Sequence, residues 1–321
     1  MSQSMSGGRL PRETSPVHGK IFLAPGMDAE LGTRLLQLPA IRIISEGRRG
    51  RLEQVEEAGV PYARKVYRVT KKSIHGTAVR CLPAFMRWGR ARRSWRAMIQ
   101  GEAKGLPLPR ALSRIENRQQ ARLVTTWIPG EPLHLWHARQ LQRDPSEEWQ
   151  RQFADWLGQQ LHKIFASGLA TRDLSPNNVL IAGELKGPWQ FHVVDLDEAR
   201  IQQYAEGETF IDQVIYSLSQ VGHLPPTISP SLRMRALFSF LRNGGQRWAE
   251  DQGDFSLTST THKNSKRARK KFIRQIVEGV QRFDRRKEQH LLKAGRTGRY
   301  AGWGLDDEGC PLPYEGAREL S

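Results

Sequence analysis

The sequence predicts an α+β fold in which strands dominate the first part of the chain and helices the second. Three short runs, at 40–44, 51–55 and 62–67, have the length and composition of strands. Beyond residue 147, apolar residues instead recur every three or four positions, as they do on one face of a helix. At 321 residues, the chain is long enough for two modest lobes with a core each.

The net charge is the most informative bulk property of the chain. The 50 Lys and Arg residues exceed the 33 Asp and Glu residues, which gives a formal charge of +17. An excess of this size predicts an anionic partner: nucleic acid, phospholipid head groups or a phosphorylated glycolipid. Composition alone does not choose among these three.

The distribution of apolar residues and cysteines indicates a protein of the reducing cytoplasm. No run approaches the roughly 18 apolar residues that a membrane-spanning helix requires. The N-terminus has no apolar segment after its charged residues, so we expect no secretory signal. Two cysteines, Cys81 and Cys310, are too few for a disulfide framework or a zinc site.

Composition also predicts how the chain divides. Residues 1–35 open with Ser, Gly, Pro and charged residues, and we expect them to form a loose tail. The strand patterns place a first lobe at 36–130, and the helical patterns place a second lobe at 131–294. The last segment, 295–321, is rich in Gly and Pro and is expected to be loosely held.

Two glycines, Gly47 and Gly50, lie between the first two predicted strands. Backbone N–H groups approach phosphates closely where no side chain intervenes, so this position suits a nucleotide-binding loop. An ordinary hairpin turn explains two glycines at least as well. Both interpretations stand at this point.

A strongly basic segment follows the third predicted strand. No acidic residue occurs between Lys65 and Gly101, and the stretch 85–98 interleaves aromatic residues with arginines. Trp88 and Trp95 are seven positions apart and share one face of a helix. That face either packs on the lobe while the arginines are solvated, or lies among anionic head groups at a membrane surface. The two interpretations are compatible.

The middle and the end of the chain predict one strand and several helices. Residues 121–128 form a strand pattern that ends at Pro129-Gly130. Residues 147–167 form an amphipathic helix, which Gly168 stops. Further helices are predicted at 210–221, 231–241 and 263–293. The last of them contains a basic run at 266–271, which by default is a solvated helix start and otherwise binds phosphates.

The stretch 168–200 contains the residues that suggest a chemistry. Two apolar runs, 178–182 and 191–194, are joined by a Gly-containing turn and predict a short hairpin. The hairpin brings four polar residues to one edge: Asp173, Asn178, Asp195 and Asp197. Their oxygens are the ligands that Mg²⁺ prefers. The alternative is that these residues serve only as turn formers.

The spacing of these residues is more specific than their number. Asp173 and Asn178 are five apart, as in the catalytic loop H-R-D-x-x-x-x-N, and Asp195-Leu196-Asp197 follows where kinases carry D-F-G. Over residues 41–200 the chain therefore resembles the protein-kinase-like superfamily. It is most similar to the bacterial lipopolysaccharide-core (Kdo/heptose) kinases. The resemblance implies a bilobal protein-kinase-like fold with a small β-rich N-lobe and a larger, mainly helical C-lobe.

The resemblance also implies ATP and Mg²⁺ as cofactors and a role for each residue of the hairpin. Asp173 would be the catalytic residue, and Asn178, Asp195 and Asp197 would hold the metal. Asn177 is an adjacent rival of Asn178, but the five-residue spacing selects Asn178. Asp197 stands where D-F-G kinases have glycine, and its other possible role is to bind the acceptor.

The nucleotide-binding residues are implied in the same way. Lys65 lies in Tyr62-Ala63-Arg64-Lys65, which resembles the V-A-I-K strand whose lysine pairs with nucleotide phosphates. Lys71 and Lys72 are rivals, and the order of elements favours Lys65. Gly47 and Gly50 would cover the phosphates, and the strand before Pro129 would lead into the hinge that contacts adenine.

One element of the kinase pattern is missing. Kinase-like folds use a helix glutamate to hold the strand lysine, and alignment on the Gly105–Pro109 turn places Ser94 near that position. Glu102 is the closest acid and lies nearer the helix end. Either Glu102 takes the role, or the lysine is held differently, or catalysis is weak.

The resemblance and the charge together predict an ATP- and Mg²⁺-dependent phosphotransferase acting on a sugar hydroxyl of the lipopolysaccharide inner core. The expected partners are that core or another anionic glycolipid, together with an anionic membrane surface. We expect the protein to be cytoplasmic and to associate peripherally with the cytoplasmic face of the inner membrane. The alternatives are a non-catalytic kinase-like scaffold and a kinase for another small molecule or a protein. Nucleic acid is not favoured because no binding module for it is recognisable.

Overall fold

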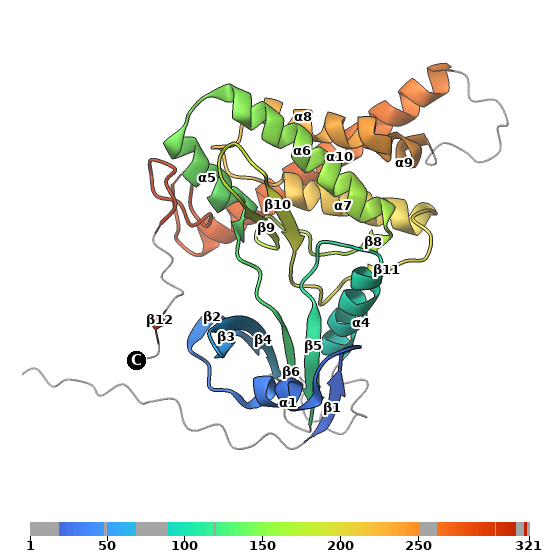
Figure 1. Ribbon diagram of the computed structural model, residues 1–321. Coiled ribbons are helices and arrows are strands. Elements are labelled where there is room, and N and C mark those ends of the chain that lie inside the picture. Colours follow the sequence, from blue (N-terminus) through green and yellow to red (C-terminus); the bar gives the residue numbers. More distant parts are fainter. Residues whose placement is uncertain are drawn as a thin grey trace, which may run out of the picture. The chain divides into compact units, whose positions relative to one another are not determined.

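The computed structural model describes residues 19–47, 50–68, 89–117, 120–250, 262–298, 300–312 and 318–319 (Figure 1). It contains two compact units. The strand unit comprises Met1–Trp88, Leu112–Thr125 and Gly316–Ser321. The helical unit comprises Gly89–Ala111 and Thr126–Glu315.

The strand unit is built on a seven-stranded sheet in the order β1-β5-β6-β4-β3-β2-β12. The three predicted strands at 40–44, 51–55 and 62–67 are confirmed as β2, β3 and β4, and the strand predicted at 121–128 as β6. The strands are β1 (Lys20–Leu23), β2 (Arg42–Gly47), β3 (Gly50–Glu57), β4 (Val60–Arg68), β5 (Ala111–Glu116), β6 (Gln120–Thr126) and β12 (Arg318–Glu319).

Helix α1 (Ala29–Gln37) supplies much of the core of the strand unit. Its Leu35 and Leu36 are fully buried against Leu112, Ile115 and Val124 of the sheet. The expectation of a loose tail over residues 1–35 is therefore wrong for the part that contains β1 and α1. The apolar residues of α1 recur at helical spacing, and the Asp28 carboxylate caps its first turn by accepting from the Leu31 N–H at 2.8 Å.

The helical unit contains the helices predicted from the later part of the sequence, which are confirmed. Helix α6 packs against α8, and α7 packs against α10 (Figure 1). Its helices are α4 (Gly89–Ala103), α5 (Leu133–Arg143), α6 (Glu147–Ala166), α7 (Glu208–Gly222), α8 (Pro230–Phe240), the π-helical turn η1 (Leu241–Gly245), α9 (Gln246–Glu250) and α10 (His262–Lys293). No helix in the described part of the chain is long and apolar enough to cross a membrane.

Five short strands complete the helical unit. They are β7 (Glu131–Pro132), β8 (Leu169–Ala170), β9 (Val179–Ala182), β10 (Gln190–Val193) and β11 (Arg200–Ile201). Strand β9 pairs with both β7 and β10, whereas β8 pairs with β11. Because β8 and β9 flank one loop and β10 and β11 flank another, these pairs bring the loops 171–178 and 194–199 into the same region of the unit.

The core of the helical unit explains why the amphipathic pattern at 147–167 folds as α6. The apolar face of α6 is buried, and its Phe153 stacks on Trp136 of α5 with ring centroids 4.8 Å apart. Gly168 then ends the helix in a left-handed conformation with φ +87°. Helix α6 is therefore followed, after the short strand β8, by the loop that begins at Thr171.

The C-terminal segment is better ordered than its Gly and Pro content suggests. Tyr300 and Leu305 are buried against Ala138 of α5, with Leu135 and Trp303 packed around them. The expectation of a loosely held tail over 295–321 is therefore wrong for residues 300–312. The aromatic and apolar residues dispersed among the glycines are what anchor the segment.

Candidate active site

The predicted hairpin is present as β9 and β10. Val193 of β10 pairs with Val179 of β9, and the Val194 N–H donates to the Asn178 carbonyl oxygen at 2.9 Å. The next residue after Val194 is Asp195. The register therefore brings Asn178 and Asp195 to the same end of the hairpin, as the sequence predicts.

The loop before β9 brings Asp173 to Asn178. The Asn178 side-chain nitrogen Nδ2 donates to the Asp173 carbonyl oxygen at 3.0 Å, and the Asp173 N–H donates to Thr171 Oγ1 at 3.1 Å. Asn178 is half-buried, whereas Asn177 is exposed. The contacts thus favour Asn178 over its neighbour as the structured residue of the loop.

Helix α7 supports this loop from behind. Gln220 accepts from the Leu174 N–H through Oε1 at 3.0 Å, and Ser217 Oγ donates to the Thr171 carbonyl oxygen at 2.7 Å. Both contacts join residues 46 positions apart in sequence. Sequence reasoning did not identify Ser217 or Gln220, since no local spacing or motif signals such a contact.

Asp195 adopts a conformation that is uncommon for a residue with a side chain. Its φ is +56°, in the left-handed region, and the only other described non-glycine residue with positive φ is Ala58. The residues on its C-terminal side are anchored, because Leu196 and Ala199 are both buried. Non-glycine residues in such conformations cluster at functional sites, where the surrounding structure holds them.

Asp197 is bound to helix α4. Ser94 Oγ donates to Asp197 Oδ1 at 2.9 Å, and Arg93 Nε donates to the Asp197 carbonyl oxygen at 3.0 Å. Next to this pair, Arg90 Nη2 lies 3.8 Å from Glu198 Oε1. Ser94 lies near the position where the helix glutamate of kinases is expected. It therefore contacts the acidic segment of the site directly.

The buried face of α4 differs from the tryptophan face considered from the sequence. It consists of Ala91, Ser94, Ala97, Met98 and Gly101. Trp95 is only half-buried, and Trp88 lies outside the described residues. Small residues let the helix approach its neighbours closely, which brings the short Ser94 side chain within reach of Asp197.

Glu102, the acid considered as a substitute for the helix glutamate, is engaged elsewhere. Its Oε1 lies 2.9 Å from Arg110 Nε, and the two side chains are 45% and 49% exposed. Both residues belong to the helical unit, near the C-terminal end of α4. This is the geometry of a solvated surface ion pair.

Lys65 lies on β4 in the strand unit, between β3 and β6. Its side chain is half-buried, with Nζ 5.3 Å from the centre of the Tyr67 ring. The preceding residue, Arg64, is 1% exposed, and its Nε lies 2.6 Å from Glu53 Oε2. Successive side chains of a strand point to opposite faces, so Lys65 is on the face opposite this buried ion pair. The rival lysines at 71 and 72 lie outside the described residues.

Gly47 and Gly50 pair with each other at the end of the β2–β3 hairpin. A Cβ atom on Gly50 would lie 2.0 Å from the Val66 carbonyl oxygen, whereas a Cβ on Gly47 would meet nothing within 4 Å. Close packing against β4 therefore accounts for glycine at position 50. The residues between the two glycines lie outside the described part of the chain.

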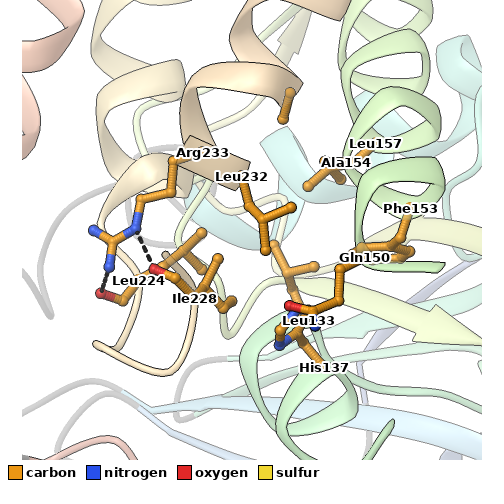
Figure 2. A pocket seen from close by; sticks show the side chains of 11 residues that line it. Leu133, His137, Gln150, Phe153, Ala154, Leu157, Leu224, Ile228, Leu232 and Arg233 are labelled. Atoms are coloured by element: carbon orange, nitrogen blue, oxygen red, sulfur yellow. Dashed lines mark hydrogen bonds between the residues drawn. The ribbon is translucent and has the colours of Figure 1, made fainter. Parts of the chain in front are cut away.

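Two cavities of the helical unit lie away from these residues. The first, of about 30 Å³, is lined mainly by apolar residues of α5, α6 and α8 (Figure 2). Burial lowers the pKa of His137 in its wall to about 4. The second, of about 380 Å³, opens beside Gly183, at the turn end of the β9–β10 hairpin. Asn178 and Asp195 flank the opposite end, so neither cavity contains the predicted site residues.

The donor set at the hairpin end fits a magnesium ion held together with a nucleotide. Among the residues that the structure describes, no three His, Cys, Asp or Glu side chains gather closely enough to hold a metal by themselves. Mg²⁺ usually takes one or two protein carboxylates and completes its shell with phosphate oxygens and water. Because Asn178 Nδ2 is used by Asp173, its amide oxygen is the atom that can join the Asp195 carboxylate as a ligand.

Comparisons with known proteins address the fold and the family. The chain is similar to the solved structure described as WaaP in complex with acyl carrier protein, with a TM-score of 0.50 and 15% identity over 80% of this chain and 99% of that one. It is also similar to a double mutant of the PknI kinase domain of Mycobacterium tuberculosis, with a TM-score of 0.36 and 16% identity over 58% of this chain and 71% of that one. The likeness to WaaP, together with the strands and helices described above, confirms the predicted α+β, protein-kinase-like fold class.

Sequence comparison gives the family. No curated protein matches the sequence. The family described as lipopolysaccharide kinase (Kdo/WaaP) matches residues 38–209, which is more than half of the chain. This range includes the hairpin, its flanking acidic residues, Lys65 and α4. The chain therefore belongs to the lipopolysaccharide kinase (Kdo/WaaP) family and is a kinase.

Proposed function

We propose that this kinase transfers the γ-phosphoryl group of ATP, with Mg²⁺, to a sugar hydroxyl of the lipopolysaccharide inner core, on Kdo or heptose. Family membership supports the substrate class. The observation that carries the proposal within this chain is the cluster at one end of the hairpin. There the Asn178 side chain donates to the Asp173 carbonyl oxygen, and Asp195 follows Val194, whose N–H donates to the Asn178 carbonyl oxygen.

Asp173 is assigned the role of catalytic base. Its backbone is held by Thr171 and Asn178, and the loop around it is held by Ser217 and Gln220 of α7. A carboxylate carried on a backbone held in this way can orient the acceptor hydroxyl and accept its proton as the phosphoryl group is transferred. Positioning of this kind supplies much of the catalysis in phosphoryl transfer.

Asn178 and Asp195 are assigned to the metal. Asp197, predicted as a third metal residue, accepts a hydrogen bond from Ser94 through Oδ1 and is not assigned to the metal here. When bound, Mg²⁺ would neutralise charge on the phosphate oxygens. Lys65, on the face of β4 opposite the buried Arg64–Glu53 pair, is assigned to the nucleotide phosphates. Gly47 and Gly50 at the β2–β3 turn, and the segment after β6, are assigned to the same nucleotide.

The charge of the chain supports an anionic, membrane-presented acceptor. Helix α10 alone carries 12 of the 50 Lys and Arg residues and only three acidic residues. We assign the protein to the cytoplasm, with peripheral contact at the inner membrane, where a basic surface attracts anionic head groups. The same basic surface would attract a glycolipid that carries phosphate groups.

The test uses phosphate transfer from ATP to lipopolysaccharide whose core phosphates have been removed chemically. We expect Asp173→Ala and Asp195→Ala to abolish transfer while thermal unfolding stays close to that of the wild type. Asp307→Ala is the matched control, because Asp307 is exposed on the C-terminal segment. Retained transfer in either site variant would sink the assignment.

The acceptor is tested separately in the cell. Mass spectrometry of the lipopolysaccharide core from a deletion strain should show the loss of one phosphate. An unchanged core, with the purified enzyme still active on ATP, would redirect the assignment to another small molecule or to a protein.

A further inference from the structure

Helix α4 and the acidic segment 195–198 are joined by three contacts within the helical unit. Ser94 Oγ donates to Asp197 Oδ1 at 2.9 Å, Arg93 Nε donates to the Asp197 carbonyl oxygen at 3.0 Å, and Arg90 faces Glu198 at 3.8 Å. Ser94 itself is only 1% exposed. A buried hydroxyl bonded to a carboxylate is a charge-assisted contact with little competition from water.

We propose that Ser94 and Asp197 are positioning residues, whose hydrogen bond holds α4 against the acidic segment and thereby fixes Asp195. The proposal rests on the function proposed above, because it concerns what Asp195 does there. In this view α4 acts on the metal-binding segment directly, through a neutral hydroxyl, and needs no glutamate to do so.

The backbone of Asp195 explains why such a contact is needed. Its φ of +56° is costly for a residue with a side chain and persists only where the surroundings hold it. On the N-terminal side, Val193 and Val194 donate to the Pro107 and Asn178 carbonyls at 3.0 and 2.9 Å. On the C-terminal side, Asp197 is held by α4. Asp195 lies between these two anchors.

The same geometry shows that Ser94 does not merely stand in for a lost glutamate. A glutamate at position 94 would bring a second carboxylate against the half-buried Asp197. Two carboxylates so placed repel each other, and one of them would have to bind a proton or move away. Restoring the usual kinase residue should therefore displace the segment that carries Asp195.

Four single variants test this inference by phosphate transfer at saturating ATP. Loss of a partner that orients a metal ligand costs about 10- to 100-fold in activity or metal affinity, and we expect Ser94→Ala and Asp197→Ala to lower kcat by that amount. Ser94→Thr keeps the hydroxyl and should stay within about threefold of the wild type. Asp197→Asn keeps an oxygen that can accept from Ser94 and should also retain most activity.

Two further variants test whether Ser94 and Asp197 act through one bond and whether a carboxylate is tolerated at position 94. Because both alanine substitutions remove the same bond, the double variant Ser94→Ala/Asp197→Ala should be no worse than either single one. Ser94→Glu should be less active than Ser94→Ala. An increase in activity above Ser94→Ala would contradict the proposal, since it would mean that a carboxylate is tolerated there.

A second readout does not depend on turnover. The Mg²⁺ concentration needed for stabilisation by a non-hydrolysable ATP analogue, measured by thermal shift, should rise in Ser94→Ala. The matched control is Ser239→Ala, because Ser239 is also 1% exposed and donates to a backbone carbonyl, that of Asp155, at 2.6 Å. It should lower the melting temperature about as much as Ser94→Ala while leaving kcat and the Mg²⁺ requirement unchanged.

The outcomes separate this proposal from the function on which it rests. Wild-type kcat in Ser94→Ala, with Asp173→Ala and Asp195→Ala inactive, would overturn the positioning role alone. Asp197→Asn as damaging as Asp197→Ala, with a raised Mg²⁺ requirement, would make Asp197 a metal ligand instead. Activity in Asp173→Ala and Asp195→Ala would overturn the proposed function itself.

Discussion

Each unit of the molecule buries a polar contact between side chains, and the two contacts differ in charge and in what they hold. In the strand unit, Glu53 is fully buried and forms ion pairs with Arg64 and Arg51. In the helical unit, the buried Ser94 hydroxyl binds Asp197. The first contact joins two charged groups, whereas the second joins a neutral group to a charged one.

The charged cluster that Glu53 forms with Arg64 and Arg51 supports the fold of the strand unit. Arg64 Nη1 donates to the Leu38 carbonyl at 2.6 Å, and Arg122 Nη1 donates to the Leu36 carbonyl at 2.7 Å, at the C-terminal end of α1. Arginines at this end satisfy carbonyls that have no partner within the helix. Burial and the charge of Arg64 lower the pKa of Arg122 to about 10, which still leaves it charged at neutral pH.

Two adjacent residues of strand β4 carry charges with different roles, one structural and one proposed to be functional. Arg64 is committed to Glu53 and α1, whereas the adjacent Lys65 points to the other face of β4. In the helical unit, the side-chain carboxylate of Asp197 is bound by the neutral Ser94 hydroxyl, whereas Arg93 binds the Asp197 backbone and Arg90 faces Glu198. A buried ion pair thus supports the fold in the strand unit, whereas in the helical unit a buried neutral hydroxyl binds a carboxylate of the acidic segment.

The largest effect is expected from breaking the charged cluster. Glu53→Ala leaves the buried Arg64 and the half-buried Arg51 without their partner, and removal of one partner from a buried ion pair costs about 3–5 kcal/mol. Urea unfolding should show this loss. Glu57→Ala is the control, since Glu57 pairs with the half-exposed Arg34 at 3.1 Å and should cost no more than about 1 kcal/mol. Equal costs for the two variants would contradict the structural role of Glu53.

The next effect distinguishes the two faces of β4. We expect Lys65→Met to lower kcat/KM by about 10²- to 10³-fold, the usual cost of removing one charged or hydrogen-bonding group from a transition state. Its free energy of unfolding should change by less than about 1 kcal/mol, because the side chain is only half-buried. Arg64→Met should instead destabilise the protein as Glu53→Ala does. If both substitutions mainly destabilise, Lys65 belongs to the fold and not to the site.

The sequence predicted those parts of the site that depend on local spacing. The hairpin, the five-residue interval between Asp173 and Asn178, and the helix that leads to them all follow from patterns within about 30 residues. The contacts that hold the site do not. Ser94 contacts Asp197, 103 positions away in sequence, and Gln220 contacts Leu174, 46 positions away. A single serine or glutamine shows no periodicity from which such a partner could be predicted.

The fold follows the same rule. Strands β2 to β4 and helices α6 to α8 were predicted because their apolar residues recur regularly. Helix α1 was missed because its segment follows a tail rich in Ser, Gly and Pro, which dominated the composition of the first 35 residues. The Tyr300–Leu305 segment was missed because isolated aromatic residues among glycines form no period, although they pack on α5.

A third prediction concerns pH and the buried histidine of the helical unit. Burial lowers the pKa of His137 to about 4, below the usual 6.5. Between these values the unfolded chain binds the proton and the folded protein does not, so stability falls as pH drops from 6.5 towards 4. The loss can reach about 3 kcal/mol. His137→Leu should make this part of the stability profile less steep, as measured by urea unfolding at pH 7 and pH 4.5, while His134, whose pKa burial also lowers to about 4, accounts for a remaining part.

The control for this prediction is His290→Leu, since His290 is exposed on α10. Phosphate transfer by His137→Leu at pH 7 should equal that of the wild type, because His137 lines the apolar cavity and is not among the site residues (Figure 2). An unchanged pH profile in His137→Leu would mean that His137 is protonated in the folded protein.

The smallest effect is expected at Glu102, and it bears directly on how α4 works. Its pair with Arg110 is solvated, and exposed pairs of this kind contribute about 0–1 kcal/mol. Glu102→Gln should therefore leave the free energy of unfolding and kcat nearly unchanged, whereas Ser94→Ala lowers kcat. If Glu102→Gln instead loses as much activity as Lys65→Met, and the double variant is no worse than either, then Glu102 holds the lysine as a helix glutamate would. A silent Glu102→Gln beside an impaired Ser94→Ala would show that α4 acts through its buried serine, on the acidic segment that carries Asp195.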